Sequence, residues 1–276
     1  MRFGAGKPRC RRSIVSPLLS DRLTVGLAPA RVTLARATGL LRSRITSRNS
    51  FECKTDERAL GWTGSVATLG KIAEKLRGDR LRVTVVLSNH FVRYTVVPFD
   101  GAISGEAEEL AYARFHFSRI HGEAAASWDI RLSRSSRGVP RLASAIDRVL
   151  LDALRDCFPT SARARLVSVQ PLLMSVQNRR VDTAPWLLLV ERGRACVASA
   201  PGGRWQTVQS MRGDFSAPES WPALLARALL RCDGAEQGEV LVQSFAGTEF
   251  PAFVSGRWRF SAAVGAGQSA VVAGAA

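Results

Sequence analysis

Residues 23–36 read LTVGLAPARVTLAR, and residues 186–199 read WLLLVERGRACVAS. In each stretch, two runs of apolar and β-branched residues flank a short turn, which is Ala-Pro-Ala at 28–30 and Glu-Arg-Gly-Arg at 191–194. Paired runs of this kind predict β-hairpins. Because one hairpin opens each half of the chain, and helices as well as strands follow, the sequence predicts a two-lobed α/β fold with mixed sheets rather than a doubly wound parallel sheet.

Apolar periodicity places further elements around these hairpins. Residues at helical spacing predict helices at 65–77, 104–121, 141–157, 171–178 and 221–231. Alternating or β-branched runs predict further strands at 81–87, 91–97, 128–132, 165–169, 205–208, 239–242 and 258–260. No element is predicted in the polar stretch at 43–58. The chain is therefore divided into a basic flexible arm at 1–22, a first lobe at 23–180, a smaller second lobe at 181–262 and an Ala/Gly-rich tail at 263–276.

The net charge of +16 is concentrated near the N-terminus. Residues 1–48 hold eleven basic residues against Asp21 alone, a surplus of +10. Arginine greatly outnumbers lysine, which together with the abundant Ala and Gly indicates the codon bias of a GC-rich genome. A basic arm is also attracted to anionic lipid surfaces or to nucleic acid. The arm has no aromatic residues interleaved on a repeated face, and this disfavours nucleic acid as the partner.

Cysteine usage and hydropathy exclude several classes of protein. The five cysteines are odd in number and widely spaced, without a C-x-x-C pair. This pattern disfavours a disulfide framework or a zinc site and fits a reducing compartment. No window approaches the roughly 20 consecutive apolar residues of a membrane span. The apolar run at 14–19 is broken by Ser16 and Pro17, so a secretory leader is not indicated and we expect a cytoplasmic protein.

Common catalytic motifs are missing from the sequence. The segment 64–72, GSVATLGKI, resembles a phosphate-binding loop, but Ile72 stands where Ser or Thr is needed and no strand precedes it. The three histidines, His90, His116 and His121, match no H-E-x-x-H pattern. We expect them to be structural rather than catalytic or metal-binding.

The order of the predicted elements resembles a family of actin-like proteins, the pilus assembly protein PilM and its type II secretion counterpart GspL. Residues 23–36 match the position of the family's first hairpin, and RLRVTVVLSNHFVRYTVVP at 80–98 resembles its paired strands. The helix and strand at 106–130 and the LVSVQPLL sequence at 166–173 are similar to the segments that follow. The resemblance covers about residues 23–260 and implies an actin-like, ribonuclease H-like fold with a trimmed second lobe.

This chain departs from the family's ATP-binding members at the first hairpin. An actin-like ATPase needs an aspartate there to organise Mg²⁺ and water, and small residues that let the backbone approach the phosphates. Gly26 and Ala28 are the small residues at this degenerate loop, but no carboxylate accompanies them, and Pro29 removes a backbone donor.

Two further loops depart as well. In the second phosphate loop, Glu191 could replace the expected aspartate and Gly193 is the remaining small residue, but the loop is short and bulky. At the adenosine side, the paired glycines are replaced by Ser-Phe-Ala-Gly at 244–247. We therefore predict a protein that is not an enzyme and needs no cofactor. Retained ATP binding through Glu191 and backbone donors is the alternative.

The resemblance also implies a partner. In PilM-like proteins a partner's short cytoplasmic tail docks on the first lobe, and here Arg93 and Tyr94 with Tyr112 and Phe115 are predicted to form such a groove. Tyr112, Phe115 and Phe117 are most simply core residues, with Ile120 on the same buried face. The predicted function is a non-catalytic scaffold of a type IV pilus or type II secretion-like platform, cytoplasmic and peripheral to the inner membrane, which it reaches through a membrane-anchored partner.

Two other functions stay open at this point. A nucleic-acid-binding protein would use the basic arm, and its DNA affinity would fall steeply with salt. A ribonuclease H-like nuclease would need carboxylates clustered at strand ends for two metal ions. Asp100, Asp129 and Glu191 lie near predicted strand ends, but the first strand supplies no carboxylate.

Overall fold

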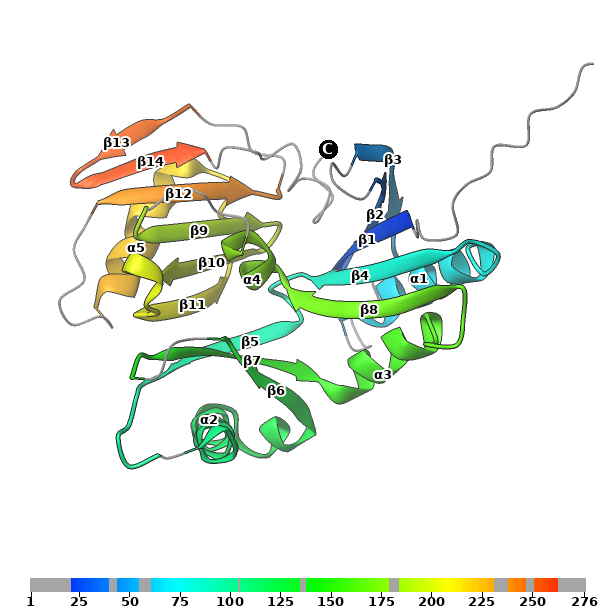
Figure 1. Ribbon diagram of the computed structural model, residues 1–276. Helices are drawn as coiled ribbons and strands as arrows, with labels where there is room; N and C mark the ends of the chain where they lie inside the picture. The colour runs from blue at the N-terminus through cyan, green and yellow to red at the C-terminus, as the bar shows by residue number, and fades with distance from the viewer. Residues whose placement is uncertain are drawn as a thin grey trace, which may run out of the picture.

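The computed structural model describes residues 21–39, 44–54, 61–103, 105–134, 138–178, 184–230, 238–246 and 251–262. Residues 1–20 of the predicted arm, the predicted tail at 263–276 and the boundary between residues 180 and 181 lie outside these ranges. Within the described ranges the chain folds into three β-sheets and five α-helices (Figure 1).

A five-stranded sheet forms most of the N-terminal half, in the order β3-β2-β1-β4-β8 (Figure 1). Its strands are β1 (Asp21–Ala28), β2 (Arg31–Thr38), β3 (Arg44–Glu52), β4 (Leu81–Leu87) and β8 (Ala164–Pro171). β1 and β2 form the first predicted hairpin, with antiparallel pairing up to Ala28 opposite Arg31. β4 and β8 extend the sheet in parallel on the other side of β1.

β3 lies in the polar stretch at 43–58, where the sequence predicts no element. The strand pairs with β2 in antiparallel orientation, yet all but one of its residues are exposed. An edge strand held by backbone hydrogen bonds needs no apolar face, so its sequence carries no alternation that would have revealed it.

A three-stranded antiparallel sheet in the order β5-β7-β6 lies below the other two in Figure 1. It consists of β5 (Val92–Val97), β6 (Trp128–Leu132) and β7 (Arg141–Asp147). The expectation that β4 and β5 are paired strands is wrong, because they belong to different sheets. The turn at residues 88–90 carries the chain from one sheet to the other.

The helix predicted at 141–157 is wrong over its first seven residues. These residues form β7, the central strand of the small sheet, and helix α3 (Arg148–Cys157) begins after Asp147, whose Oδ1 accepts a 2.9 Å hydrogen bond from the N–H of Val149. Leu142 and Ile146 fit helical spacing, but every residue between the ends of β7 is buried. Pairing with β5 and β6 decided the conformation where the local pattern was ambiguous.

A six-stranded sheet forms the C-terminal half, in the order β11-β10-β9-β12-β14-β13. Its strands are β9 (Trp186–Glu191), β10 (Arg194–Ser199), β11 (Thr207–Arg212), β12 (Glu239–Ser244), β13 (Phe253–Ser255) and β14 (Trp258–Ala262). The predicted antiparallel arrangement of the first three strands is confirmed. β11 begins two residues later than predicted, and the short β13 was not predicted.

The other helices are α1 (Thr63–Lys75), α2 (Glu106–His121), α4 (Leu172–Gln177) and α5 (Trp221–Leu229). α1 and α3 pack on one face of the five-stranded sheet, α2 packs on the small sheet, and α5 packs on the six-stranded sheet (Figure 1). None of the described helices is both long and apolar enough to cross a membrane.

Helix α2 is less buried than its sequence predicts. Its N-cap is Gly105, and the predicted cap Ser104 lies outside the described residues. Phe117 is fully buried as expected, but Phe115 and Ile120 are 55% and 63% exposed. A sheet of only three strands covers a narrow stripe of the helix, so the outer apolar positions remain in solvent.

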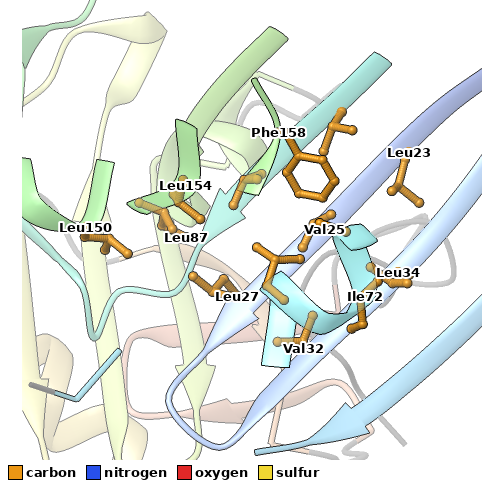
Figure 2. Close-up of a cluster of buried hydrophobic side chains, with 14 of the residues drawn as sticks. Leu23, Val25, Leu27, Val32, Leu34, Ile72, Leu87, Leu150, Leu154 and Phe158 are labelled. Carbon is orange, nitrogen blue, oxygen red and sulfur yellow. The ribbon is translucent and has the colours of Figure 1, made fainter. Parts of the chain in front are cut away.

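The cores connect the sheets. Leu23, Val25 and Leu27 of β1 meet Leu150 and Leu154 of α3 in the cluster that Figure 2 shows. A second cluster draws from every sheet: it contains Val86 of β4, Leu142 of β7, Leu187 and Leu189 of β9, and Leu173 of α4. The three sheets are therefore joined by one continuous apolar contact.

Substituting Leu150→Ala should destabilise the protein by about 2–5 kcal/mol, because Leu150 is 0% exposed and its removal leaves a cavity between α3 and β1. The neighbouring Val149 is 57% exposed, so Val149→Ala should change stability by less than about 0.5 kcal/mol. Denaturant unfolding followed by circular dichroism measures both. Equal effects of the two substitutions would contradict this packing of α3.

Candidate functional site

The tips of the two hairpins meet at one cavity. Pro29, in the turn between β1 and β2, and Gly193, in the turn between β9 and β10, both line a hollow of about 380 Å³. Its other walls include Arg93 of β5, Ala145 of β7 and Arg212 of β11. Segments from all three sheets therefore border the place where the sequence predicted two phosphate loops.

Glu191 is buried and accepts hydrogen bonds from other residues of the protein. It is the last residue of β9 and is 5% exposed. Its Oε1 accepts a 2.5 Å hydrogen bond from Ser88 Oγ, and its Oε2 accepts a 3.0 Å bond from the N–H of Asn89. Burial raises the pKa of Glu191, and the two donors offset part of that rise. Both oxygens of the predicted aspartate substitute are thus engaged by the turn between β4 and β5.

The two small residues predicted at the first loop lie within or at the end of β1. Gly26 is buried in the sheet, opposite Thr33 of β2 and Val86 of β4. Ala28 is the last residue of the strand. The cavity is bordered at this tip by Pro29, which has no N–H to donate.

Gly193 reaches the cavity because of its backbone conformation. Its φ of 74° lies in the left-handed region, which permits the two-residue turn between β9 and β10. A Cβ built at this position would lie 3.9 Å from the ring of His90. The second predicted loop is therefore a tight turn. It packs on His90, which lies in the turn between β4 and β5.

The third degenerate loop contains a buried aromatic residue. Phe245 is 7% exposed and packs in the cluster that joins the three sheets. Its N–H donates a 2.6 Å hydrogen bond to the carbonyl of Val190. An aromatic side chain thus occupies the segment where paired glycines would leave room for a purine ring. Gly247 lies outside the described residues.

Three arginines give the cavity a positive potential. Arg194 and Arg212 are directly opposite each other on β10 and β11, and Arg93 lies on the neighbouring β5. Burial, followed by the charges of Arg93 and Arg212, lowers the pKa of Arg194. Burial and all three arginine charges lower the pKa of His90 to about 4, and its Nε2 lies 3.0 Å from the carbonyl oxygen of Arg192. The cavity repels cations and attracts anions.

The carboxylates that the nuclease alternative requires form hydrogen bonds to different partners. Asp100 Oδ1 accepts from the N–H of Ala102, and Asp129 Oδ2 accepts from Arg131 Nε at 3.2 Å. In the part of the chain that the structure describes, no group of three or more His, Cys, Asp and Glu side chains is placed to hold a metal ion.

The four residues predicted to bind a partner fall into two places. Arg93 and Tyr94 are consecutive on β5 and so point to opposite faces. Arg93 lines the cavity, whereas the hydroxyl of Tyr94 donates a 2.8 Å hydrogen bond to Asn89 Oδ1. On α2, the ring of Tyr112 packs edge-on against His116, and Phe115 lies under the guanidinium of Arg119 at 5.8 Å. Their role in partner binding stays a prediction.

A groove that the sequence did not reveal lies beside β8. It has a volume of about 590 Å³ and is lined by four consecutive residues of β8, 166–169, facing Ile146 of β7, Leu151 of α3, and Phe158. β8 is the last strand of its sheet, and no described strand pairs with its outer edge. Whether a strand lies at a sheet edge depends on topology, so no local sequence signal marks this groove.

Solved structures share the overall fold of this chain. The cytoplasmic domain of EpsL, an inner membrane component of the type II secretion system of Vibrio cholerae, is similar with a TM-score of 0.58 and 16% identity, over 91% of this chain and 92% of that chain. A Bacteroides thetaiotaomicron protein with an actin-like ATPase fold and unknown function gives a TM-score of 0.54 and 12% identity, over 81% of this chain and 82% of that chain. The chain has an actin-like fold.

A third structure, the PilM–PilN type IV pilus biogenesis complex, matches with a TM-score of 0.50 and 15% identity, over 82% of this chain and 81% of that chain. No protein-family model and no curated protein matches the sequence. The predicted actin-like fold, and its resemblance to pilus and type II secretion assembly proteins, are confirmed at the level of the fold.

The raised pKa of Glu191 predicts a specific dependence of stability on pH. Between the ordinary value of 4.5 and the raised value, the folded state binds more protons at this residue than the unfolded state, so raising the pH through that window destabilises the wild type. Glu191→Gln removes this titration. Its free energy of unfolding, relative to the wild type, should therefore increase as the pH rises above 4.5 and become constant above the raised pKa.

Urea unfolding at a series of pH values measures this difference. Glu219→Gln is the matched control, because it replaces an exposed glutamate by the same amide. A difference for Glu191→Gln that is flat with pH would show that Glu191 titrates normally.

Proposed function

We propose that this chain is a non-catalytic adaptor of an inner-membrane platform that assembles a type IV pilus or a type II secretion-like apparatus. In this role it holds an extended cytoplasmic segment of a membrane-anchored partner. The observation that carries the proposal is the groove of about 590 Å³ beside β8, whose outer edge pairs with no strand that the structure describes and whose mixed lining includes Asp129, Arg131 and Arg155.

The groove has the properties of a site for β-strand addition. The outer edge of β8 offers backbone donors and acceptors that a partner strand can pair with beyond Leu166, whose N–H already donates a 3.2 Å hydrogen bond to the carbonyl of Phe158. Ile146, Leu151 and Phe158 are buried beneath and supply an apolar floor for alternate side chains of the partner. Val167 is the extra residue where β8 slips against β4, and it is 41% exposed within the groove.

The assemblies to which two similar structures belong support the proposed class of partner. EpsL is an inner membrane component of a secretion system, and PilM is part of a complex with PilN in type IV pilus biogenesis. An adaptor with this fold would meet such a partner through a segment that extends from the membrane.

The non-catalytic part of the proposal rests on the hairpin tips. The first hairpin has no carboxylate between residues 26 and 31 to bind a metal ion, and Pro29 lacks an N–H that could donate to a phosphate. The carboxylate of Glu191 is bonded to Ser88 and Asn89. Phe245 occupies the segment expected at the purine. A nucleotide with its magnesium would therefore lack a metal ligand and a base platform.

The docking proposal is tested with fluorescent peptides for the cytoplasmic tails of bitopic membrane proteins encoded beside this gene. Val167→Arg places a charge in the groove and should weaken tail binding about tenfold or more. The control is Val254→Arg, at a 67% exposed position on the edge strand β13 of the other sheet, and it should bind within about twofold of the wild type.

Fluorescence polarisation measures the dissociation constants, and circular dichroism confirms that both variants fold. Binding that resists Val167→Arg but is lost in Phe115→Asp would move the docking surface to α2, as the sequence predicted. Equal binding by all variants would remove β8 from the interface.

ATP should not be hydrolysed by the full chain. Phosphate release with Mg²⁺ should equal that of a buffer blank, because the described cavity presents three arginines and no cluster of carboxylates to a metal ion. Magnesium-dependent release that disappears in Glu191→Gln would contradict the non-catalytic assignment and would favour the nucleotide-binding alternative.

A further inference from the structure

The outer edge of β3 is open to pairing with another strand. β3 and β8 are the two edge strands of the five-stranded sheet, and among the described strands β3 pairs only with β2 (Figure 1). The N–H of Cys53 donates a 2.8 Å hydrogen bond to the carbonyl of Ala30, so the odd-numbered residues of 47–53 direct their backbone groups toward β2. Alternation then directs the backbone groups of the even-numbered residues of 48–52 to the outer edge.

A β-bulge sets the length of this edge. The register between β2 and β3 is continuous from Glu52 to Ser47 and shifts between Arg36 and Ala37. A bulge bends a strand and interrupts its ladder, so a partner strand can pair regularly with residues 47–52, which read SRNSFE. All six of these residues are exposed.

The segment 47–52 is complementary to itself in antiparallel orientation. When two copies pair about a two-fold axis at Ser50, Arg48 of each copy lies opposite Glu52 of the other. The hydrogen bonds of this register use the backbone groups that already face outward. Opposite charges in directly facing positions stabilise a sheet, and the symmetry places such a pair at both ends of the segment.

Charge selects this register over its neighbours. An axis at Arg48 or at Glu52 would place like charges opposite each other, which destabilises a sheet. An axis at Asn49 would place Arg48 opposite Ser50 and lose the charge pair. The register centred on Ser50 is therefore favoured among those that use the outward backbone groups.

The side chains on both faces suit this pairing. Arg31 Nε donates a 3.0 Å hydrogen bond to Glu52 Oε1, and Arg31 Nη2 lies 2.8 Å from the same oxygen. The Glu52 side chain is 71% exposed, so its Oε2 can accept from an arginine of another chain. On the other face Phe51 is 38% exposed. It would lie opposite Asn49 of the second copy and diagonal to the second Phe51, within reach of an aromatic side chain.

We propose that two copies of this chain pair through their β3 strands into a symmetric dimer in which the two five-stranded sheets are continuous. β8 lies at the other edge of each sheet, so both copies keep the groove beside β8 open. This goes beyond the adaptor function, because a dimer could hold two partner tails at once, and two tails anchored in one membrane would bind with greater avidity. Six residues per copy form a small interface, so the dimer should dissociate on dilution.

Sedimentation velocity of the full chain over a concentration series tests the proposal. The wild type should shift from monomer to dimer as the concentration rises. Arg48→Glu and Glu52→Arg each place like charges opposite each other at both ends of the pairing, so each should weaken the dimer about tenfold or more. The double variant Arg48→Glu/Glu52→Arg exchanges the charges and should restore the dissociation constant to within about threefold of the wild type.

Two further variants separate edge pairing from other effects. Arg257→Glu makes the same charge change at an exposed position between β13 and β14, and its dimer should dissociate within about twofold of the wild type. The N–H of Ser50 faces away from β2, so Ser50→Pro removes no hydrogen bond of the sheet but takes a donor from the dimer edge. Ser50→Pro should abolish the dimer while circular dichroism shows a folded chain.

Three results would overturn the proposal: a wild type that stays monomeric at every concentration, a dimer that neither charge reversal weakens, or a dimer that survives Ser50→Pro. A double variant that dissociates as readily as the single variants would overturn the register centred on Ser50. The measurements contain no partner tail, so their failure is distinct from a failure of the groove beside β8.

Discussion

The buried carboxylate of Glu191 is the contact on which the relation of the sheets depends. A carboxylate that is 5% exposed must have hydrogen-bond donors, and here the donors are Ser88 and the N–H of Asn89. These residues form the turn where the chain leaves one sheet for another, so β9 must sit against that turn. The amide of Asn89 in turn accepts from the hydroxyl of Tyr94, which extends the network into β5.

This contact places the tip of the β9–β10 hairpin near the tip of the β1–β2 hairpin. Strand β7 lies between the cavity at these tips and the groove beside β8. Alternate residues of a strand point to opposite faces. Ala145 and Asp147 line the arginine cavity, whereas Ser144 and Ile146 line the groove beside β8. One short strand thus provides a wall to both sites, and each site lies at a boundary between sheets rather than on a single element.

The candidate sites were predictable only in part. Pro29 and the missing aspartate are visible in the sequence, because the first hairpin is local and its turn is short. The arginine cluster is not visible, since its members come from β5, β10 and β11 and meet only through the pairing of strands. The hydrogen bond from the hydroxyl of Tyr94 to Asn89 is also not visible in the sequence, and the role of Tyr94 in partner binding stays a prediction.

The sequence by itself determined both hairpins, helices α1 and α5, and the loss of the first metal-binding acid, because each depends on neighbouring residues and their period. Tertiary structure decided that residues Arg141–Asp147 are a strand and that the polar residues of β3 join a sheet. It also decided that β8 is the edge strand of the five-stranded sheet. Those outcomes depend on which strands pair across the molecule. Backbone hydrogen bonds and burial between distant segments set that pairing, and no local pattern of apolar residues encodes it.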